Sequence, residues 1–173
     1  MSTQLFSLEG RTALITGSSR GLGQGIAAGM AAAGARVVLN GTDAARVRES
    51  AQALRAQGHT VFEAPFDVCN EAAVVSAFET LDREGVEIDI LVNNAGIQHV
   101  APIPDFPTAR WDQIIAINLS SAFHTTAASL PLMRAQGWGR IINIASAHGL
   151  TASPFKSAYV AAKHGVVGFT KAV

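Results

Sequence analysis

The sequence is short of charge and of cysteine. Charged residues make up 15% of its 173 positions, and 13 basic residues balance 13 acidic ones. A neutral chain with 49% hydrophobic residues differs from a disordered segment, which combines low hydrophobicity with high net charge. It also lacks the strongly basic surface by which many proteins bind nucleic acid. We therefore expect a folded protein that binds no nucleic acid.

Long hydrophobic runs are also absent. No stretch approaches the roughly 18 uninterrupted apolar residues of a membrane span. Residues 1–9 lack the basic and then apolar regions of a secretory signal. The single cysteine, Cys69, cannot form an internal disulfide, which fits a reducing compartment. The expectation is a cytoplasmic protein without membrane contact, and zero net charge favours association with a partner chain.

Short apolar runs alternate with longer alanine-rich stretches along the chain. The runs predict strands over residues 12–16, 36–40, 60–66, 88–93 and 140–145. The stretches predict helices at about residues 21–33, 44–57, 71–84, 108–136 and 157–173. Thr108 is expected to cap the fourth helix. Apolar strands in strict alternation with helices predict a doubly wound, Rossmann-type α/β fold, with a parallel sheet covered on both faces.

The last predicted helix has no terminating glycine or proline, and residues 165–173 stop within its pattern. No linker, repeat or low-complexity tract divides the chain. We therefore expect one domain over residues 1–173, incomplete at its C-terminus and without its last strands.

A glycine-rich loop follows the first predicted strand and opens the first predicted helix. It reads Thr16-Gly17-Ser18-Ser19-Arg20-Gly21-Leu22-Gly23. Backbone N–H groups at a helix N-terminus attract phosphate, and glycines let the backbone approach a pyrophosphate closely. An ordinary glycine-rich turn is the alternative. The Gly-x-x-x-Gly-x-Gly spacing resembles the cofactor loop of the short-chain dehydrogenase/reductase family.

The rest of the chain resembles the same family. Residues 93–96, Asn-Asn-Ala-Gly, are similar to the family motif that supports the sheet beside the cofactor. Asp67, at the end of the third predicted strand, is similar in placement to the aspartate that meets the adenine ring. The residues that match the family's catalytic tetrad are Asn118, Ser146, Tyr159 and Lys163.

The residue types agree with this interpretation of the tetrad. Tyr159 is the only tyrosine, and Lys163 follows four residues later on the same predicted helix face. A nearby ammonium favours the phenolate and tunes the tyrosine as a general acid/base. Ser146 supplies a hydroxyl that can hold the substrate oxygen. Taken alone, the Tyr159–Lys163 pair also fits a solvated helix face with an aromatic anchor.

Asn118 lies on an apolar stripe of the fourth predicted helix, seven residues after Trp111. A buried amide needs hydrogen-bond partners, so a satisfied core asparagine is one explanation. The resemblance implies another, in which Asn118 kinks the helix and holds a proton-relay water near the lysine.

Residues 94–99, 142–150 and 156–171 resemble one branch of the family, the D-3-hydroxybutyrate dehydrogenases. The residues implied to bind substrate are Gln98, Ser146, His148, Lys156 and Tyr159. Three of them, Gln98, His148 and Lys156, are implied to hold the substrate carboxylate, since a hydroxy acid needs a cation and hydrogen-bond donors. Each of these three also fits an ordinary surface polar residue.

The implied reaction interconverts D-3-hydroxybutyrate and acetoacetate, a small hydroxy acid and its keto acid. Residues 6–18 and 66–68 look closer to gluconate 5-dehydrogenases, so a sugar or keto reductase is the alternative. A natural intermediate and a recombinant of two parents both fit this mixture. An inactive, truncated dinucleotide-binding fragment is an alternative of a different class.

A nicotinamide dinucleotide is the implied cofactor. The residues implied to bind it are Gly17, Ser19, Arg20, Gly21, Leu22, Gly23, Asp67, Val68, Asn94, Ala95, Gly96, Tyr159 and Lys163. An acidic residue just after the second strand would bind the ribose of NAD, but residues 40–42 offer none and Asp43 comes late. Arg20 can pair with the extra phosphate of NADP. We favour NAD, because the hydroxybutyrate dehydrogenases share this Leu-Asn-Gly ending and use NAD.

The remaining expectations concern metal binding and subunit association. The histidines outside the predicted substrate set show no metal-ligand spacing with acidic or cysteine partners, so no metal is expected. In the family, the long fourth helix and the tyrosine-bearing helix form a four-helix contact between subunits. The apolar faces of both helices allow a homo-oligomer, either a dimer or a tetramer.

Overall fold

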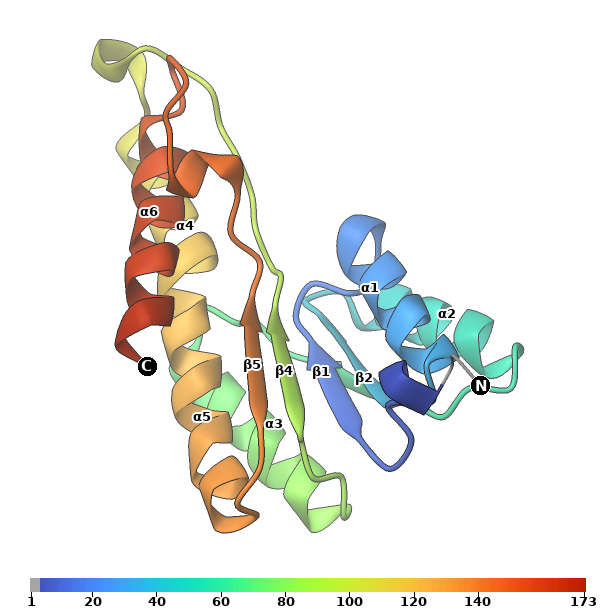
Figure 1. The fold of residues 1–173 in the computed structure, drawn as a ribbon. Helices are drawn as coiled ribbons and strands as arrows, with labels where there is room; N and C mark the ends of the chain where they lie inside the picture. The colour runs from blue at the N-terminus through green and yellow to red at the C-terminus, as the bar shows by residue number, and fades with distance from the viewer. Residues whose placement is uncertain (1–3) are drawn as a thin grey trace.

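The computed structural model describes residues 4–173, so the first three residues of the stretch assessed for a secretory signal lie outside it. Within that range, one sheet of five parallel strands has the order β3-β2-β1-β4-β5 (Figure 1). The strands are β1 (Thr12–Ile15), β2 (Arg36–Gly41), β3 (Val61–Pro65), β4 (Ile90–Asn93) and β5 (Arg140–Asn143). The predicted doubly wound α/β architecture is confirmed, although most of the strands are shorter than predicted.

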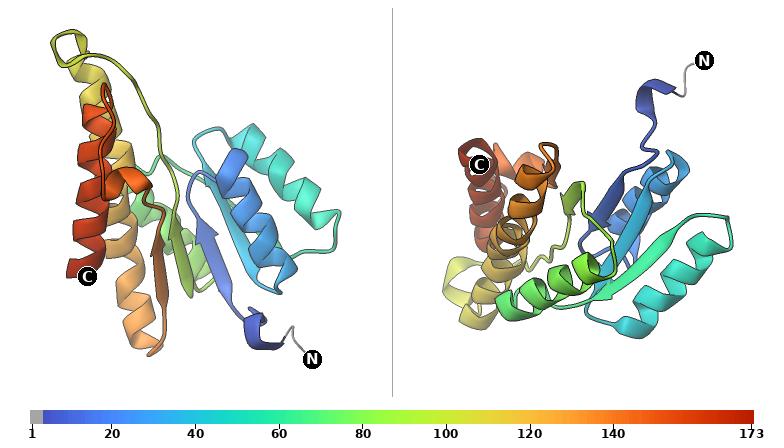
Figure 2. Two further views of the ribbon diagram at one scale, coloured as in Figure 1. Left: turned by 45° about the horizontal axis from the view of Figure 1, so that its top comes forward. Right: turned by 90° about the horizontal axis from the view of Figure 1, so that it is seen from below.

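The helices cover both faces of this sheet. Their bounds are α1 (Gly21–Ala32), α2 (Ala44–Arg55), α3 (Glu71–Arg83), α4 (Thr108–Ile115), α5 (Ser121–Ala135) and α6 (Ser157–Ala172). One face carries α1 and α2, and the other carries α3 and α5, with α4 and α6 beyond them (Figure 2). No helix within residues 4–173 combines the length and the apolar character that a bilayer crossing needs.

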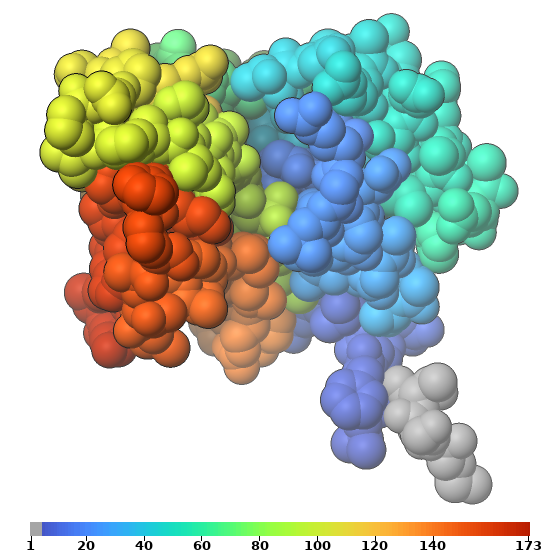
Figure 3. Space-filling model, turned by 90° about the horizontal axis from the view of Figure 1, so that it is seen from above, coloured from blue at the N-terminus to red at the C-terminus, as the bar shows by residue number. Residues whose placement is uncertain are grey.

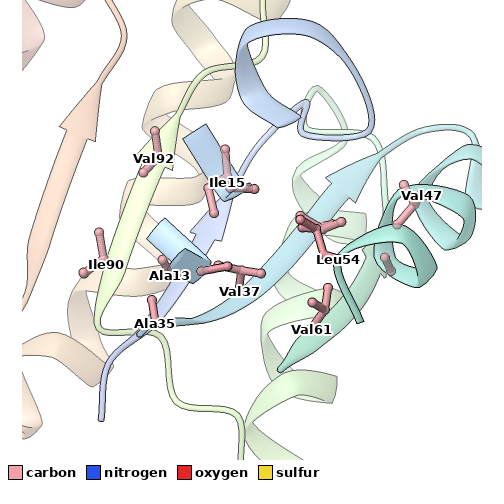
Figure 4. Close-up of a cluster of buried hydrophobic side chains, with 13 residues drawn as sticks. Ala13, Ile15, Ala35, Val37, Val47, Leu54, Val61, Ile90 and Val92 are labelled. Atoms are coloured by element: carbon pink, nitrogen blue, oxygen red, sulfur yellow. The ribbon is translucent and has the colours of Figure 1, made fainter. Parts of the chain in front are cut away.

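Strand residues alternate between two hydrophobic clusters, one on each face of the sheet. On β1, Ala13 and Ile15 pack with α1 and α2, whereas Leu14 faces α3 and α5. Figure 4 shows the first cluster, in which Val37, Val47 and other side chains from neighbouring strands and helices meet. Because both faces are buried, the central strands are apolar at every position, as the sequence pattern predicted.

Side chains and glycines mark the helix ends. Asp43 accepts a hydrogen bond from the Arg46 amide at 3.1 Å and thereby caps α2. Gly34 follows α1 with a φ of +99°, a conformation that favours glycine. The prediction for Thr108 is wrong, because it is the first residue of α4. The capping position belongs to Pro107, which has no side-chain donor or acceptor.

The long helix predicted over residues 108–136 is interrupted in its middle. A π-helical segment, Ala116–Ser120, separates α4 from α5 and contains Asn118. A π-helical turn closes its hydrogen bonds over five residues instead of four, so it inserts an extra residue and redirects the side chains beyond it. The π-helical segment lies where the resemblance implied a kink at Asn118.

Candidate active site

The glycine loop between β1 and α1 is fixed by a buried asparagine at the end of β2. Asn40 Oδ1 accepts a hydrogen bond from the Gly17 amide at 3.1 Å. Its Nδ2 donates to the carbonyl oxygens of Ala64 and Phe66 at 3.1 and 3.0 Å. Ser18 Oγ adds a bond to the Ile15 carbonyl at 2.7 Å. Hydrogen bonds within the protein thus define the shape of the loop.

The start of α1 is suited to an anion. Arg20 occupies its N-cap position without a side-chain hydrogen bond, and no acidic residue lies in the first turn. The free amides and the helix dipole therefore present positive partial charge. A Cβ atom on Gly23 would collide with the Gly17 carbonyl oxygen and with Asn94 Nδ2, whereas the same atom on Gly21 would enter open space.

The Asn-Asn-Ala-Gly segment after β4 binds to the glycine loop from the other side. Thr16 Oγ1 accepts hydrogen bonds from the Asn94 and Ala95 amides at 2.9 and 3.0 Å. Asn94 Nδ2 donates to the Thr16 carbonyl at 2.9 Å. Asn93 is buried, and its Oδ1 accepts a hydrogen bond from Thr125 Oγ1 at 2.6 Å. These contacts hold the ends of β1 and β4 in one fixed arrangement.

A cleft of about 640 Å³ opens at the carboxyl end of the sheet. Figure 3 views the molecule from this end and shows a hollow between the blue segments of the first half and the orange and yellow-green segments of the second. Its walls are built from the glycine loop, the ends of β2, β3 and β4, the π-helical segment and α6. This is the crevice where doubly wound proteins generally bind ligands.

Every residue predicted to bind the cofactor lines this cleft. Of the predicted tetrad, Asn118, Tyr159 and Lys163 line it, whereas Ser146 lies just beyond the lining residue Ala145. Of the residues predicted for substrate alone, Gln98 lines the cleft. His148 and Lys156 lie outside the lining, and His148 is connected to it through Ser146 and Tyr159.

Lys163 is the most deeply buried charged group of the site. It is 5% exposed, and its Nζ donates a hydrogen bond to the Ile144 carbonyl at 2.6 Å. Burial of the charged form lowers the pKa of Lys163 below its ordinary value. The ammonium lies 5.7 Å from the centre of the Tyr159 ring. The lysine is thus held beneath the tyrosine by the end of β5.

Asn118 is anchored to the segment that follows β4. Its Oδ1 accepts from the Ile97 amide at 2.9 Å, and its Nδ2 donates to the Ile97 carbonyl at 2.7 Å. The residue is 3% exposed. Both ends of the amide are therefore satisfied, as a buried polar group requires. The side chain ties the π-helical segment to the cleft wall, and the proton-relay water stays a prediction.

Ser146 and His148 form a polar group beside Tyr159. The amide of His148 donates to Ser146 Oγ at 3.2 Å, and His148 Nδ1 lies 3.3 Å from the same oxygen. The imidazole meets the Tyr159 ring edge to face, with 5.8 Å between centroids. On its other side, Nε2 lies 2.8 Å from Ser153 Oγ. Ser146, predicted to be the catalytic serine, is thus one end of a series of side chains that continues through His148 to Ser153.

The cleft has lining residues that the sequence-based site did not include. They are Asn40, Gly41, Thr42, Asp43, Arg46, Phe66, Ile97, Ile117, Ile144 and Ala145. Most of them come at or just after the end of a strand or beside a predicted site residue. The rule that ligands bind at the carboxyl ends of parallel strands was the available signal for these positions.

Charges gather at the rim of the cleft near the end of β2. Arg20, Asp43 and Arg46 all line it and are exposed. Arg46 Nε lies 3.7 Å from Asp43 Oδ2, so these two charges partly offset each other. Within residues 4–173, no group of three histidine, cysteine or acidic side chains is arranged to hold a metal ion.

The glycine loop at a helix N-terminus, the Asn-Asn-Ala-Gly clasp and the Tyr-x-x-x-Lys pair in one cleft define a dinucleotide-binding α/β protein. The family model described as short chain dehydrogenase matches residues 11–173. The chain belongs to the short-chain dehydrogenase/reductase family, which confirms the resemblance seen in the sequence.

Individual relatives refine this comparison. The D-beta-hydroxybutyrate dehydrogenase of Cupriavidus necator is 54% identical over 164 residues, which are 95% of this chain and 64% of that protein. The gluconate 5-dehydrogenase of Gluconobacter oxydans is 40% identical over 167 residues, which are 96% of this chain and 65% of that protein. Both groups that the sequence resembled are therefore among its relatives. The chain spans about 64% of the length of the first of them.

A solved structure agrees with the same family. The gluconate 5-dehydrogenase from Burkholderia cenocepacia, in complex with NADP and tartrate, superimposes with a TM-score of 0.96 at 39% identity. The match covers 99% of this chain and 68% of that one. The arrangement of strands and helices described above is therefore that of an experimentally determined family member.

Proposed function

We propose that this chain is the cofactor-binding and catalytic part of a nicotinamide-dependent oxidoreductase. The reaction would interconvert a small hydroxy acid, D-3-hydroxybutyrate, and its keto acid, acetoacetate. The observation that carries this proposal is that Tyr159 and Lys163 lie in the cleft that the glycine loop also lines. An acid/base group and an anion-binding helix end in one crevice suit transfer between a dinucleotide and a small substrate.

The residues of the cleft fit a dinucleotide. The free amides at the start of α1 and the open space above Gly21 suit a pyrophosphate. Asp67 and Val68 follow β3 and line the same cleft, where an adenine ring can lie. A bound nicotinamide dinucleotide would supply the hydride acceptor or donor.

The side chains of the tetrad divide the remaining work. Tyr159 gives or takes the proton at the substrate oxygen through its hydroxyl. Lys163 is held by the Ile144 carbonyl, and its ammonium lies 5.7 Å from the centre of the tyrosine ring, so its positive charge is close to the proton-transfer group. Ser146 Oγ holds the substrate oxygen, and Asn118 keeps the π-helical segment against the cleft wall.

A carboxylate-bearing substrate is supported by the polar residues around the tyrosine. Gln98 lines the cleft, and His148 and Lys156 flank the loop that leads into α6. The relative with 54% identity is named for D-beta-hydroxybutyrate. Gluconate is the second candidate substrate, because a relative with 40% identity is a gluconate 5-dehydrogenase. Both substrates carry a carboxylate and a secondary alcohol.

We favour NAD over NADP as the cofactor. Asp43 lines the cleft beyond β2, and its negative charge disfavours the additional phosphate of NADP. Arg46 is engaged with Asp43, which leaves Arg20 as the cation that argues for NADP. Calorimetric titration of the chain with each cofactor tests this choice. Asp43→Asn should increase the affinity for NADP relative to that for NAD. Arg20→Gln should decrease the affinity for NADP relative to that for NAD.

Subunit association is proposed through the faces of α4, α5 and α6. Phe123 on α5 is a large apolar side chain that is 56% exposed, and contact with a second copy would remove its surface from water. Sedimentation of the chain tests the proposal, and a monomer at all concentrations would contradict it. The single cysteine supports a reducing, cytoplasmic location.

The proposed reaction is tested by substituting Tyr159 with phenylalanine. Turnover of D-3-hydroxybutyrate with NAD should fall at least about 100-fold, because the proton donor is lost. Binding of NAD, measured by calorimetry, should persist. Lys163→Met should also lower turnover, and Lys171→Met is its matched control, since Lys171 is exposed on the same helix. Full turnover by the Tyr159→Phe variant would overturn the mechanism, and NAD binding without turnover by the unaltered chain would favour the inactive fragment.

A further inference from the structure

His148 lies between two serine hydroxyls, and each of its ring nitrogens is within hydrogen-bond distance of one of them. Nδ1 is 3.3 Å from Ser146 Oγ, and Nε2 is 2.8 Å from Ser153 Oγ. A neutral imidazole carries its proton on one nitrogen only, so it donates to one serine and accepts from the other. The position of the ring proton therefore fixes the direction of both hydrogen bonds together. The hydrogen bond with Ser153 is one of the two that influence this position.

The direction matters for what Ser146 can do. Its Oγ already accepts a hydrogen bond from the His148 amide at 3.2 Å. If Nδ1 carries the ring proton, Oγ accepts a second bond, both lone pairs are used, and the hydroxyl proton is free to point away. If Nδ1 is bare, the hydroxyl proton of Ser146 is drawn into the bond with the ring. Only the first arrangement leaves a donor for a substrate oxygen.

The loop that carries Ser153 is held in a fixed conformation. The Thr151 amide donates to the Ala147 carbonyl at 3.0 Å, which closes the turn behind His148. Phe155 has a φ of +64°, unusual for a residue other than glycine, and its carbonyl accepts from the Ala101 amide at 3.0 Å. Such a conformation persists where the surroundings fix it. Ser153 is therefore a fixed partner of the ring rather than a mobile surface residue.

The packing around His148 fixes the ring as well. Its edge-to-face contact with Tyr159 limits rotation about the side-chain bonds. A Cβ on Gly149 would lie 2.8 Å from Val167 Cγ2 and 2.9 Å from the Lys163 carbonyl, so this turn packs closely against α6. The ring is thus held by the same helix that carries the tyrosine and the lysine.

We propose that Ser153 is a positioning residue, which donates its hydroxyl proton to His148 Nε2 and so fixes the ring proton on Nδ1. In this tautomer His148 donates to Ser146 Oγ, and the Ser146 hydroxyl is left as the donor to the oxygen of the substrate. Both ring nitrogens are then engaged, so His148 acts on the substrate through Ser146, and Gln98 and Lys156 remain as the groups that can bind its carboxylate. The choice of this tautomer rests on the proposed function, because it is the one that leaves the Ser146 hydroxyl free for a substrate oxygen. The contacts of His148 with Ser146 and Ser153 do not rest on it. Ser153 touches neither substrate nor cofactor in this role.

The tautomer can be measured directly in the unliganded chain. Nitrogen NMR at alkaline pH, where imidazole rings are neutral, distinguishes a protonated ring nitrogen from a bare one. The chain has five histidines, and the resonances of His148 are assigned by their loss in His148→Gln. We expect Nδ1 to be protonated and Nε2 bare in the unaltered chain. Ser153→Ala should redistribute the proton toward Nε2, and Ser153→Thr, which keeps the hydroxyl, should restore the original pattern.

Kinetic measurement then tests the link to Ser146. Ser153→Ala should lower kcat by about 10-fold, by analogy with the loss of about 10-fold to 100-fold seen when hydrogen-bond partners of metal-binding histidines are removed. The affinity for the dinucleotide should stay unchanged, and Ser153→Thr should recover most of the rate. Thr151→Ala is the matched control, because Thr151 is an exposed hydroxyl residue of the same loop. A purely structural role would alter the melting temperature without moving the ring proton.

The outcomes separate this proposal from the proposed function. A bare Nδ1 in the unaltered chain, or a ring proton that stays in place in Ser153→Ala, would overturn the role of Ser153. A protonated Nδ1 that responds to Ser153, in a chain without turnover of hydroxy acids, would leave the positioning role standing and contradict the proposed reaction. If Ser153→Ala fails to fold, the unaltered chain and Ser153→Thr still decide the tautomer.

Discussion

Asn40 and Gly17 are joined by a hydrogen bond that links the end of β2 to the first glycine of the cofactor loop. The Gly17 amide donates to Asn40 Oδ1 at 3.1 Å, and the same side chain donates from Nδ2 to Ala64 and Phe66. Asn40 is 1% exposed. One buried amide therefore connects the loop to the end of β2 and also connects that strand to the last residues of β3 and the residue that follows it.

Replacing Asn40 with alanine should lower the free energy of unfolding by about 2–4 kcal/mol, because buried polar groups of the backbone lose their partner. Urea unfolding measures this change. Asn70→Ala is the matched control. Asn70 makes a single N-cap bond to the Ala73 amide, whose loss should cost about 1 kcal/mol. Equal effects of the two substitutions would contradict the role assigned to Asn40.

A methyl group at Gly23 should disturb the cofactor site more than the helix. In Gly23→Ala the new Cβ would collide with the Gly17 carbonyl and with Asn94 Nδ2, so the loop must shift. We expect NAD affinity to fall by at least about 10-fold, since the loop amides no longer converge on one point. Calorimetric titration measures this loss.

Gly25→Ala provides the control for Gly23→Ala in the same helix. A Cβ at Gly25 meets nothing within 4 Å. Alanine is the better helix former, so this variant should gain about 0.5–1 kcal/mol of stability. Its NAD affinity should not change. If both variants lose NAD binding equally, the close approach at Gly23 is not what the site requires.

Much of the fold and of the candidate site could be predicted from the sequence. Apolar strands and helical spacing determine the alternation of β1 to β5 with the helices, because both depend on local periodicity. The glycine loop and the Tyr159–Lys163 pair are contiguous or closely spaced, so their residues could be recognised without knowing the fold. All of them meet in the cleft because parallel strands end at the same edge.

The features that escaped prediction depend on contacts between distant segments. From the sequence, Asn40 is only a position at which an acidic residue is lacking. In the structure its amide forms hydrogen bonds with Gly17, Ala64 and Phe66 from within the sheet. Ser153 contacts His148 only because of the conformation of the loop between them, which the sequence does not show. Thr108 was a plausible cap by residue type, and the choice of Pro107 over Thr108 depends on where the chain enters the helix. Residue type alone carries no such information.

The thiol of Cys69 should react slowly and should respond to Asp67. Burial, the negative charge of Asp67 and a hydrogen bond to that carboxylate raise the pKa of Cys69 to about 11. Only the thiolate is nucleophilic, so alkylation by iodoacetamide near neutral pH should be slow. Asp67→Asn removes the charge and should accelerate the reaction by about 3-fold to 10-fold.

The measurement for Cys69 is the alkylation rate by mass spectrometry, which is unambiguous because the chain has one cysteine. Glu71→Gln is the control, since Glu71 is a nearby exposed acid that does not contribute to the shift of the thiol pKa. Acceleration in both variants would assign the effect to the general field of the surface. No acceleration in Asp67→Asn would leave burial as the sole cause.

The burial of Lys163 should make stability depend on pH in the alkaline range. Burial lowers the pKa of Lys163 below the ordinary 10.5, to which it returns in the unfolded chain. Between the lowered pKa and 10.5, the unfolded state binds more protons than the folded state. The free energy of unfolding therefore increases as pH rises through this window, because Lys163 loses its proton and the cost of burying the charged ammonium disappears. Below the window that cost is present in full.

Lys163→Met removes the titrating group and isolates this contribution. The free energy of unfolding of the variant minus that of the unaltered chain should be largest below the window and should decrease as pH rises toward 10.5. Urea unfolding at a series of pH values from about 8 to about 11 measures the difference, in which other titrations cancel. Lys171→Met should give a flat difference, because Lys171 is exposed on the same helix. A flat difference for Lys163→Met would mean that the ammonium is as well solvated by the Ile144 carbonyl as it is by water.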